Sequence, residues 1–212
     1  MNTLIKYPRT PHLPYSMGFT SDDKVLKDDS IFNGKEVVVT TKMDGENTTI
    51  YSSGFCHARS LNSNHRSYHS WLLSYVPTIA YKIPKGYRLC GEYMYAKHSI
   101  AYNELDSYFL AFSLWNDYNE CLSWQEFEEF CQNNEIFHVP VLYKGHYNSA
   151  KIKEIAENAV KNGQEGIVVR NIEPFYYTDF KDNVAKYVRQ NHVTTDAHWS
   201  LNTIIPNRIK EN

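Results

Sequence analysis

The feature that most constrains the fold is a pair of β-rich runs separated by a short polar break. Residues 36–41 (EVVVTT) and 48–51 (TTIY) are rich in β-branched side chains, which favour strands. The break at 43–46 contains Gly45, which has no side chain and lets a ligand approach the backbone closely. The pattern predicts an antiparallel hairpin with Lys42 at its mouth.

Three later stretches carry helical signals. They are residues 67–75, 123–133 and 149–162. The first is expected to end before Pro77, because proline disfavours the helical conformation in the residue that precedes it. Ser123 and Glu126 form a capping box that opens the second helix, and Gly163 provides a C-terminal stop for the third.

Four further runs have the composition of strands. They are residues 87–94 (YRLCGEYM), 108–115 (YFLAFSLW), 165–170 (EGIVVR) and 183–189 (NVAKYVR). Strands and helices in this order predict an α+β fold of antiparallel sheets with helices on their outer faces. Neither a repeat nor a linker divides the chain, so we expect a single domain over residues 1–212.

Composition is that of a soluble globular protein, with 42% hydrophobic and 22% charged residues. No apolar run approaches the length of a signal peptide or a membrane span. The four cysteines form no CxxC pair, so we expect reduced thiols. These observations favour a cytoplasmic protein without a membrane partner.

Charge is segregated along the chain, although the formal net charge is only −2. The stretch from Asn47 to Gly91 contains no Asp or Glu, and the stretch from His98 to Tyr143 contains no Lys or Arg. The cations of the first stretch are Arg59, Arg66, Lys82, Lys85 and Arg88. Because Lys and Arg hold phosphate backbones, we expect this stretch to contact a polyanion. The alternative is a chance separation over two solvated faces.

Six short motifs follow one another in a fixed order. They are KMDG at 42–45, HARS at 57–60, CGEY at 90–93, YFLAF at 108–112, QEGIVVR at 164–170 and NVAKYVR at 183–189. This order resembles the covalent nucleotidyltransferase superfamily of DNA ligases, RNA ligases and mRNA capping enzymes. KMDG alone would be weak support, since such turns occur in many surface hairpins. The six motifs together extend the resemblance over most of the chain, from about residue 40 to 190.

Within that superfamily the chain is most similar to RNA ligases of the bacteriophage type. Asn47 completes a KxDGxN pattern typical of that branch. The strings PRTPHLP near the start, GEYMYAKHSIAYNEL at 91–105 and KYVRQNHVTTDAHW at 186–199 also look like it. One departure lies in the last motif, where Val188 replaces the second of two lysines. Either Lys186 alone meets the phosphate, or Arg189 contributes through a bulge.

The resemblance implies a ligase-type nucleotidyltransferase (adenylation) domain that joins RNA ends with ATP and Mg²⁺ or Mn²⁺. In such a reaction Lys42 takes AMP from ATP, and the AMP then moves to the 5′-phosphate of an RNA. A 3′-hydroxyl finally attacks the activated end and releases AMP. The enzyme chiefly aligns the reacting groups and neutralises charge.

The same resemblance assigns expected catalytic roles. Lys42 is the nucleophile, and Lys186 would hold the α-phosphate and help to keep Lys42 uncharged. Glu92 would accept a hydrogen bond from a ribose hydroxyl, and Arg59 would contact the ribose or the incoming 5′-phosphate.

Further expected roles concern nucleotide and metal binding. Phe112 is our choice for the adenine stack, with Phe109 on the other face of the strand as the alternative. Glu165 and Asn47 would bind the metal directly or through water, since hard oxygen ligands suit Mg²⁺. The expected nucleotide-binding residues are Thr41, Lys42, Asp44, Gly45, Arg59, Glu92, Phe112, Glu165, Lys186 and Arg189.

Three other functions compete with this one. A DNA ligase or a GTP-dependent capping enzyme usually carries an OB-fold after the last motif, and residues 187–212 are too few for its five strands. We therefore expect a minimal RNA ligase domain without a C-terminal OB-fold, or one that relies on a homodimer or an accessory domain in trans for the missing clamp. A viral source would place it in the host cytoplasm. A catalytically idle nucleic-acid-binding relative would be expected to have lost Lys42, Glu92, Glu165 or Lys186, and all four are present.

Overall fold

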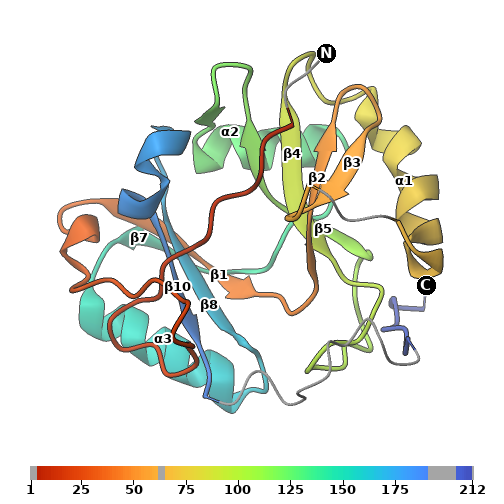
Figure 1. Ribbon diagram of the computed structural model, residues 1–212. Helices are drawn as coiled ribbons and strands as arrows, with labels where there is room; N and C mark the ends of the chain where they lie inside the picture. Colours follow the sequence, from red (N-terminus) through yellow and green to blue (C-terminus); the bar gives the residue numbers. More distant parts are fainter. Residues whose placement is uncertain (1–3, 62–64, 191–203, 212) are drawn as a thin grey trace. The chain divides into compact units, whose positions relative to one another are not determined.

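The computed structural model describes residues 4–61, 65–190 and 204–211, and its backbone packs as two compact units (Figure 1). The Lys42 unit comprises Pro8–Met43 and residues 139–190. The Asp44 unit comprises residues 44–138 and both described ends, 4–7 and 204–211. The KMDG motif therefore contributes residues to both units. The expectation of one nucleotidyltransferase domain over residues 1–212 stays a prediction.

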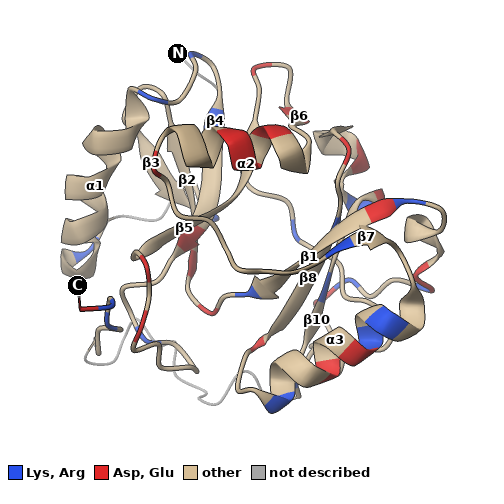
Figure 2. Ribbon diagram, turned by 180° about the vertical axis from the view of Figure 1, so that it is seen from behind, with Lys and Arg blue, Asp and Glu red and all other residues tan. Residues whose placement is uncertain are grey.

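A four-stranded antiparallel sheet forms the Lys42 unit, in the order β10–β8–β1–β7. Its strands are β1 (Glu36–Lys42), β7 (Val141–His146), β8 (Gly166–Asn171) and β10 (Val184–Val188). Helix α3 (Ser149–Lys161) covers one face, and its charged residues, which are coloured along the helix in Figure 2, are exposed. The core on that face consists of Leu13, Phe32, Val37, Val39, Ile152, Ala156, Ala159, Ile167, Val169, Ala185 and Tyr187. Because side chains alternate along a strand, Lys42 and Lys186 lie on the opposite face.

Shorter elements complete the Lys42 unit. They are η1 (Ser30–Phe32), β9 (Phe175–Tyr176) and η3 (Tyr177–Asp182). The N-terminal segment adds backbone hydrogen bonds to β10, since the Leu13 N–H donates to the Lys186 carbonyl at 2.8 Å. The Lys186 N–H in turn donates to the Pro11 carbonyl at 2.9 Å. Lys186 is thus held by backbone bonds to a segment far from it in sequence.

The Asp44 unit is built on an antiparallel sheet in the order β3–β2–β4–β5–β6. Its strands are β2 (Glu46–Tyr51), β3 (Cys56–Ala58), β4 (Arg88–Tyr93), β5 (Phe109–Trp115) and β6 (Glu120–Cys121). Its helices are η2 (Ser67–His69), α1 (Ser70–Ala80) and α2 (Trp124–Asn133). The central strands β4 and β5 are almost wholly buried, so this sheet forms the core of the unit.

The predicted hairpin with Lys42 at its mouth does not form. Strand β1 pairs with β7 and β8, whereas β2 pairs with β3 and β4. The polar break is held by other partners, because the Gly45 N–H donates to Glu92 at 3.2 Å and a loop binds the Asp44 carboxylate. A Cβ on Gly45 would lie 2.5 Å from the Tyr93 carbonyl oxygen, so the glycine permits close packing rather than a hairpin turn.

Helix α1 also differs from the prediction, since it continues through Pro77 to Ala80. A proline inside a helix removes the hydrogen bond to the carbonyl four residues earlier, here that of Leu73. Both Leu73 and Pro77 are exposed, so water can take the place of the lost donor. The loss is tolerated because it falls on the solvent side of the helix.

The remaining predicted elements are confirmed, and with them the α+β fold. Strands β4, β5, β8 and β10 and helices α2 and α3 lie where their local signals placed them. The Ser123–Glu126 capping box is formed, with the Glu126 carboxylate accepting from the Ser123 N–H at 3.0 Å. The four cysteines are buried and free, as expected. Among the described residues, no helix is long and apolar enough to cross a membrane.

Gly166 provides a test of the close pairing between β8 and β10. A Cβ at this position would lie 1.9 Å from the Tyr187 carbonyl oxygen, so Gly166→Ala forces the two strands apart. We expect a loss of about 3 kcal/mol or more in the free energy of unfolding, measured by urea denaturation. The control is Gly163→Ala, where no atom lies within 4 Å but φ is +82°. That variant should lose only about 1–2 kcal/mol from backbone strain, and equal losses would contradict the steric explanation.

Candidate active site

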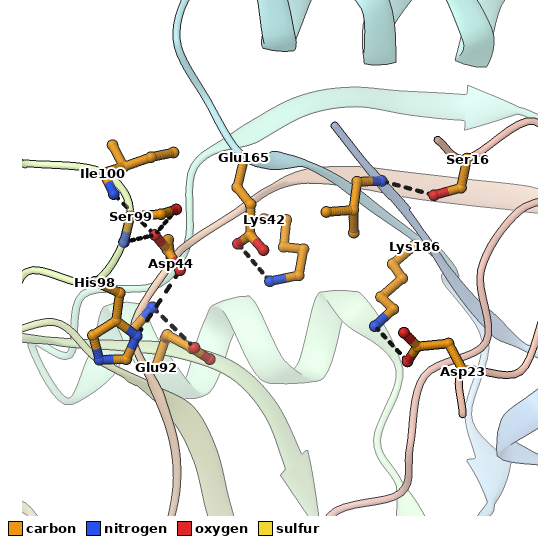
Figure 3. A network of polar contacts seen from close by, with 12 residues as sticks. Ser16, Asp23, Lys42, Asp44, Glu92, His98, Ser99, Ile100, Glu165 and Lys186 are labelled. Atoms are coloured by element: carbon orange, nitrogen blue, oxygen red, sulfur yellow. Dashed lines mark hydrogen bonds and ion pairs between the residues drawn. The ribbon is translucent and has the colours of Figure 1, made fainter. Parts of the chain in front are cut away.

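Lys42 ends β1 with its amine in an ion pair with Glu165 (Figure 3). The Lys42 Nζ lies 2.5 Å from a carboxylate oxygen of Glu165, and the two side chains are 23% and 5% exposed. Glu165 immediately precedes β8, in which Gly166 pairs with Lys42. A nearby carboxylate favours the charged ammonium form. Lys42 must therefore leave Glu165 or give up a proton before its amine can act as a nucleophile.

Lys186 shares the open face of the sheet with Lys42. It pairs with Val168 of β8, whereas Lys42 pairs with Gly166, two positions earlier in the same strand. The two lysines therefore lie diagonally across β8. The Lys186 Nζ lies 3.9 Å from a carboxylate oxygen of Asp23. Each lysine therefore has a carboxylate beside it.

Asp23 carries no signal in the sequence beyond its spacing from Thr20, which is that of a side-chain-capped turn. Its second carboxylate oxygen accepts from the N–H and the hydroxyl of Thr20, at 3.0 and 3.1 Å. Partial burial acts to raise the pKa of Asp23, but these bonds, Lys186 and His12 outweigh it and lower the pKa below its ordinary value. Asp23 is thus held ionised beside Lys186.

The Asp44 carboxylate is bound by the loop that follows β4. One of its oxygens accepts hydrogen bonds from the Ser99 N–H, the Ser99 hydroxyl and the Ile100 N–H, at 2.8, 2.6 and 3.0 Å. The Asp44 N–H donates to the Tyr102 hydroxyl at 3.1 Å, and His98 lies 3.9 Å from the second carboxylate oxygen. The aspartate of the KMDG motif therefore anchors this loop (Figure 3).

Glu92 and Asn47 face one another across β4 and β2, where they form a register pair. Glu92 accepts from the Gly45 N–H, which fixes the motif glycine to β4. The Asn47 side-chain oxygen is buried and has no hydrogen-bond partner among the described residues. An unsatisfied amide oxygen beside a carboxylate is chemically suited to a hydrated Mg²⁺ or to a ligand hydroxyl.

The described residues contain no group of three or more His, Cys, Asp or Glu side chains that would hold a metal by themselves. This is compatible with Mg²⁺, which is commonly bound through one or two carboxylates, water and substrate phosphates. Glu165 and Asn47 each fit such a role separately, as a buried carboxylate and as the unsatisfied amide oxygen.

Three other expected site residues differ in their exposure. Arg59 is exposed just after β3, and its N–H donates to the Asn47 carbonyl at 3.0 Å. Thr41 is buried on the face that α3 covers, opposite to the side of Lys42. Arg189 follows β10, and its N–H donates to the Glu165 carbonyl at 2.9 Å. Strand β10 pairs regularly through Val188, so the bulge considered for Arg189 is absent from it.

Phe112 is the extra residue of a β-bulge in β5. Gly91 pairs with Ala111 and the next pair joins Cys90 to Ser113, which leaves Phe112 without a partner on β4. Bulges redirect a side chain out of the regular alternation. Phe112 is half-buried, with its ring centroid 5.1 Å from that of Tyr7. The alternative stacking residue, Phe109, is fully buried in the core and offers no face to a base.

The cationic stretch divides into structural and exposed side chains. Arg88 is buried against the Trp115 ring, 4.8 Å from its centroid, and hydrogen-bonds Asn119, so its predicted contact with a polyanion is wrong. The Lys82 amine donates to the Asn134 carbonyl at 2.7 Å and serves the fold as well. Exposed cations of this stretch are Arg59, Arg66 and Lys85. The stretch from His98 to Tyr143 contributes acidic residues to α2, where they are drawn in red in Figure 2.

Comparison with known proteins places these residues in a family. The RNA ligase family matches residues 35–188, which covers five of the six motifs completely and the sixth up to Val188. No curated protein matches the sequence. The string at 186–199 also looks like that of bacteriophage-type RNA ligases, but its residues 191–199 lie outside the described residues.

Solved structures of RNA ligases resemble the chain at low sequence identity. An archaeal ATP-dependent RNA ligase matches with a TM-score of 0.62 and 16% identity, over 89% of this chain and 49% of that one. A Naegleria gruberi RNA ligase variant with ATP and Mn gives 0.56 and 16%, over 88% and 61%. The Naegleria gruberi enzyme with PPi gives 0.55 and 19%, over 89% and 61%. The chain thus spans about half to three fifths of these proteins. It belongs to the RNA ligase family and has the fold of ATP-dependent RNA ligases.

Proposed function

We propose that this chain is an ATP-dependent RNA ligase that first attaches AMP to Lys42. The observation that carries the proposal is the placement of Lys42 at the end of β1, paired with buried Glu165 and on the same sheet face as Lys186. One face thereby offers a nucleophile, a neighbouring carboxylate and a second cation. Membership of the RNA ligase family supports the choice of reaction.

In the first step the uncharged Lys42 amine attacks the α-phosphorus of ATP. A phosphorus–nitrogen bond forms, the bond to the pyrophosphate oxygen breaks, and the lysine loses a proton. Glu165 is close enough to accept that proton, since its carboxylate already hydrogen-bonds the amine at 2.5 Å. Lys186 then offsets the negative charge of the phosphates once they replace Asp23 as its partner.

Residues of the Asp44 unit are proposed to serve nucleotide binding as well as the later steps. AMP moves from Lys42 to the 5′-phosphate of an RNA, and a 3′-hydroxyl then displaces AMP to form the new phosphodiester. Glu92 accepts from a ribose hydroxyl, exposed Arg59 contacts ribose or the 5′-phosphate, and Phe112 stacks on adenine. Glu165 and Asn47 are each proposed as ligands of Mg²⁺ or Mn²⁺, which would supply charge neutralisation at the phosphates.

The proposal extends to substrate and setting. RNA with 5′-phosphate and 3′-hydroxyl ends is the expected partner, as in RNA repair, and the expected location is the cytoplasm. A homodimer or an accessory domain in trans would clamp the RNA. The solved relative described with ATP and Mn supports the choice of ATP and a divalent metal.

The proposed nucleophile is tested by intact-protein mass spectrometry after incubation with Mg²⁺ and ATP. We expect the mass to rise by one AMP, with no increase for Lys42→Ala because that variant lacks the attacking amine. Lys153→Ala, which removes an exposed lysine from α3, serves as the matched control and should form the adduct normally.

Other results of the same measurement identify the competing functions. An adduct with GTP alone would favour the capping reaction. Absence of any adduct would point to the idle relative, provided that the starting mass shows protein free of AMP. An adduct that persists in Lys42→Ala would refute Lys42 as the nucleophile.

The exposed cations of the Asp44 unit predict where RNA binds. Arg66→Gln and Lys85→Gln should each weaken binding of single-stranded RNA and reduce the slope of log affinity against log salt by about 0.7. Adduct formation should be unchanged, because neither residue belongs to the proposed catalytic set. Lys153→Gln on α3 is the control with the same change of charge. Equal loss of RNA binding in the control, or equal loss of adduct formation, would argue against a separate RNA surface.

A further inference from the structure

The C-terminal segment 204–211 binds the loop that follows β4. Residues 94–108 of this loop contain neither helix nor strand, so their backbone groups need partners from elsewhere. Residues near the C-terminus supply them (Figure 1). The bonds are Lys97 N–H to Ile205 O at 2.8 Å, Leu105 N–H to Arg208 O at 3.0 Å, Arg208 N–H to Tyr102 O at 2.8 Å and Lys210 N–H to Leu105 O at 2.9 Å.

Asn207 is the centre of this attachment and is only 3% exposed. Its side-chain NH₂ donates to the carbonyls of Met94 and Ala96, at 2.7 and 3.4 Å. Its side-chain oxygen accepts from the Tyr102 N–H at 3.0 Å. Both ends of the amide are therefore used, and an ionised Asp side chain of the same size would lack the donor that the two carbonyls require. The Asn207 backbone also donates to the Tyr95 carbonyl at 2.7 Å.

The same loop is the structure that binds Asp44. Tyr102 connects the two sites directly, because its N–H donates to Asn207 while its hydroxyl accepts from the Asp44 N–H. Ser99 and Ile100, which bind the Asp44 carboxylate, lie on the stretch between Ala96 and Tyr102. Asn207 hydrogen-bonds both ends of that stretch, at the Ala96 carbonyl and the Tyr102 N–H. A displacement at Asn207 is therefore transmitted to the aspartate that stands two residues after Lys42.

We propose that Asn207 is a positioning residue of the active site, which fixes the loop 96–102 and, through it, Asp44 of the KMDG motif. The catalytic consequence of this proposal rests on the proposed function. Asn207 hydrogen-bonds the loop, and the loop binds Asp44, so Asn207 acts through Asp44 and the Gly45 amide next to it. No motif marks the C-terminal segment, and its role follows from these bonds alone.

Asn207→Asp tests the proposal through its pH dependence. The new carboxylate would place negative oxygen against the carbonyls of Met94 and Ala96, which repel it, whereas its protonated form can again donate to one of them. Burial raises the pKa of such a carboxyl. We expect the rate of Lys42 adenylylation, relative to wild type, to fall about tenfold or more at pH 8. The ratio should recover as the pH is lowered towards about 6, where the carboxyl regains its proton.

Asn116→Asp is the matched control in the same unit. Asn116 is 8% exposed, its NH₂ donates to Glu120 at 2.9 Å, and its oxygen accepts from the Tyr118 and Glu120 N–H groups at 3.0 Å. The substitution brings a similar repulsion to the turn between β5 and β6. The rate of adenylylation per folded molecule, with folding checked by circular dichroism at the assay temperature, should remain that of wild type at each pH.

Two further measurements keep the proposal testable whatever the stability of Asn207→Asp. Tyr102→Phe removes the hydroxyl that accepts from Asp44 and leaves Asn207 intact, so it should slow adenylylation without unfolding the protein. Hydrogen exchange of the 97–103 backbone should be faster in Asn207→Asp at pH 8 and unchanged in Asn116→Asp. The exchange readout needs no activity, so it separates failure of the loop attachment from failure of the ligase function.

The proposal is overturned by either of two results. One is a folded Asn207→Asp protein whose rate of Lys42 adenylylation equals that of wild type at pH 8, or whose adenylylation rate relative to wild type does not change with pH. The other is unchanged hydrogen exchange over residues 97–103. If wild-type protein forms no adduct while exchange responds as expected, the ligase function fails and the attachment of the loop by Asn207 stands.

Discussion

The position of strand β8 between β1 and β10 is the constraint on which the proposed chemistry depends. Its pairing places Gly166 opposite Lys42 and Val168 opposite Lys186, and the core beneath α3 fixes which face each side chain takes. A slip of one residue would turn Lys42 towards α3 and bury it among apolar side chains. The close approach of Gly166 to the Tyr187 carbonyl tightens this register, since no larger residue fits there.

Counter-charges are the second feature that organises the site. Lys42 lies beside Glu165, and Lys186 lies beside Asp23, so each lysine has an anionic neighbour. Under the proposed function, phosphates would replace these carboxylates as the partners of the lysines. Binding of a nucleotide then exchanges one set of anions for another, which avoids leaving either cation uncompensated in a half-buried place.

Local signals predicted single elements well and pairing poorly. The capping box of Ser123 and the apolar period of α3 involve residues within one or two helical turns, and both helices are confirmed. The hairpin around Lys42 is wrong because strand pairing is decided by distant partners, here β8 for β1 and β4 for β2. The bulge at Phe112 likewise depends on the register between β4 and β5, which no local pattern encodes.

The sequence by itself determined the family, the α+β class and the motif residues, because these follow from ordered short strings and local periodicity. Only the tertiary structure decided the partners of those residues. Asp23 beside Lys186, Arg88 buried against Trp115 and Asn207 bound to Tyr102 are contacts of this kind. Asn207 and Tyr102 stand 105 positions apart, and a hydrogen bond between one side chain and one backbone N–H over such a separation leaves no periodic trace in the chain.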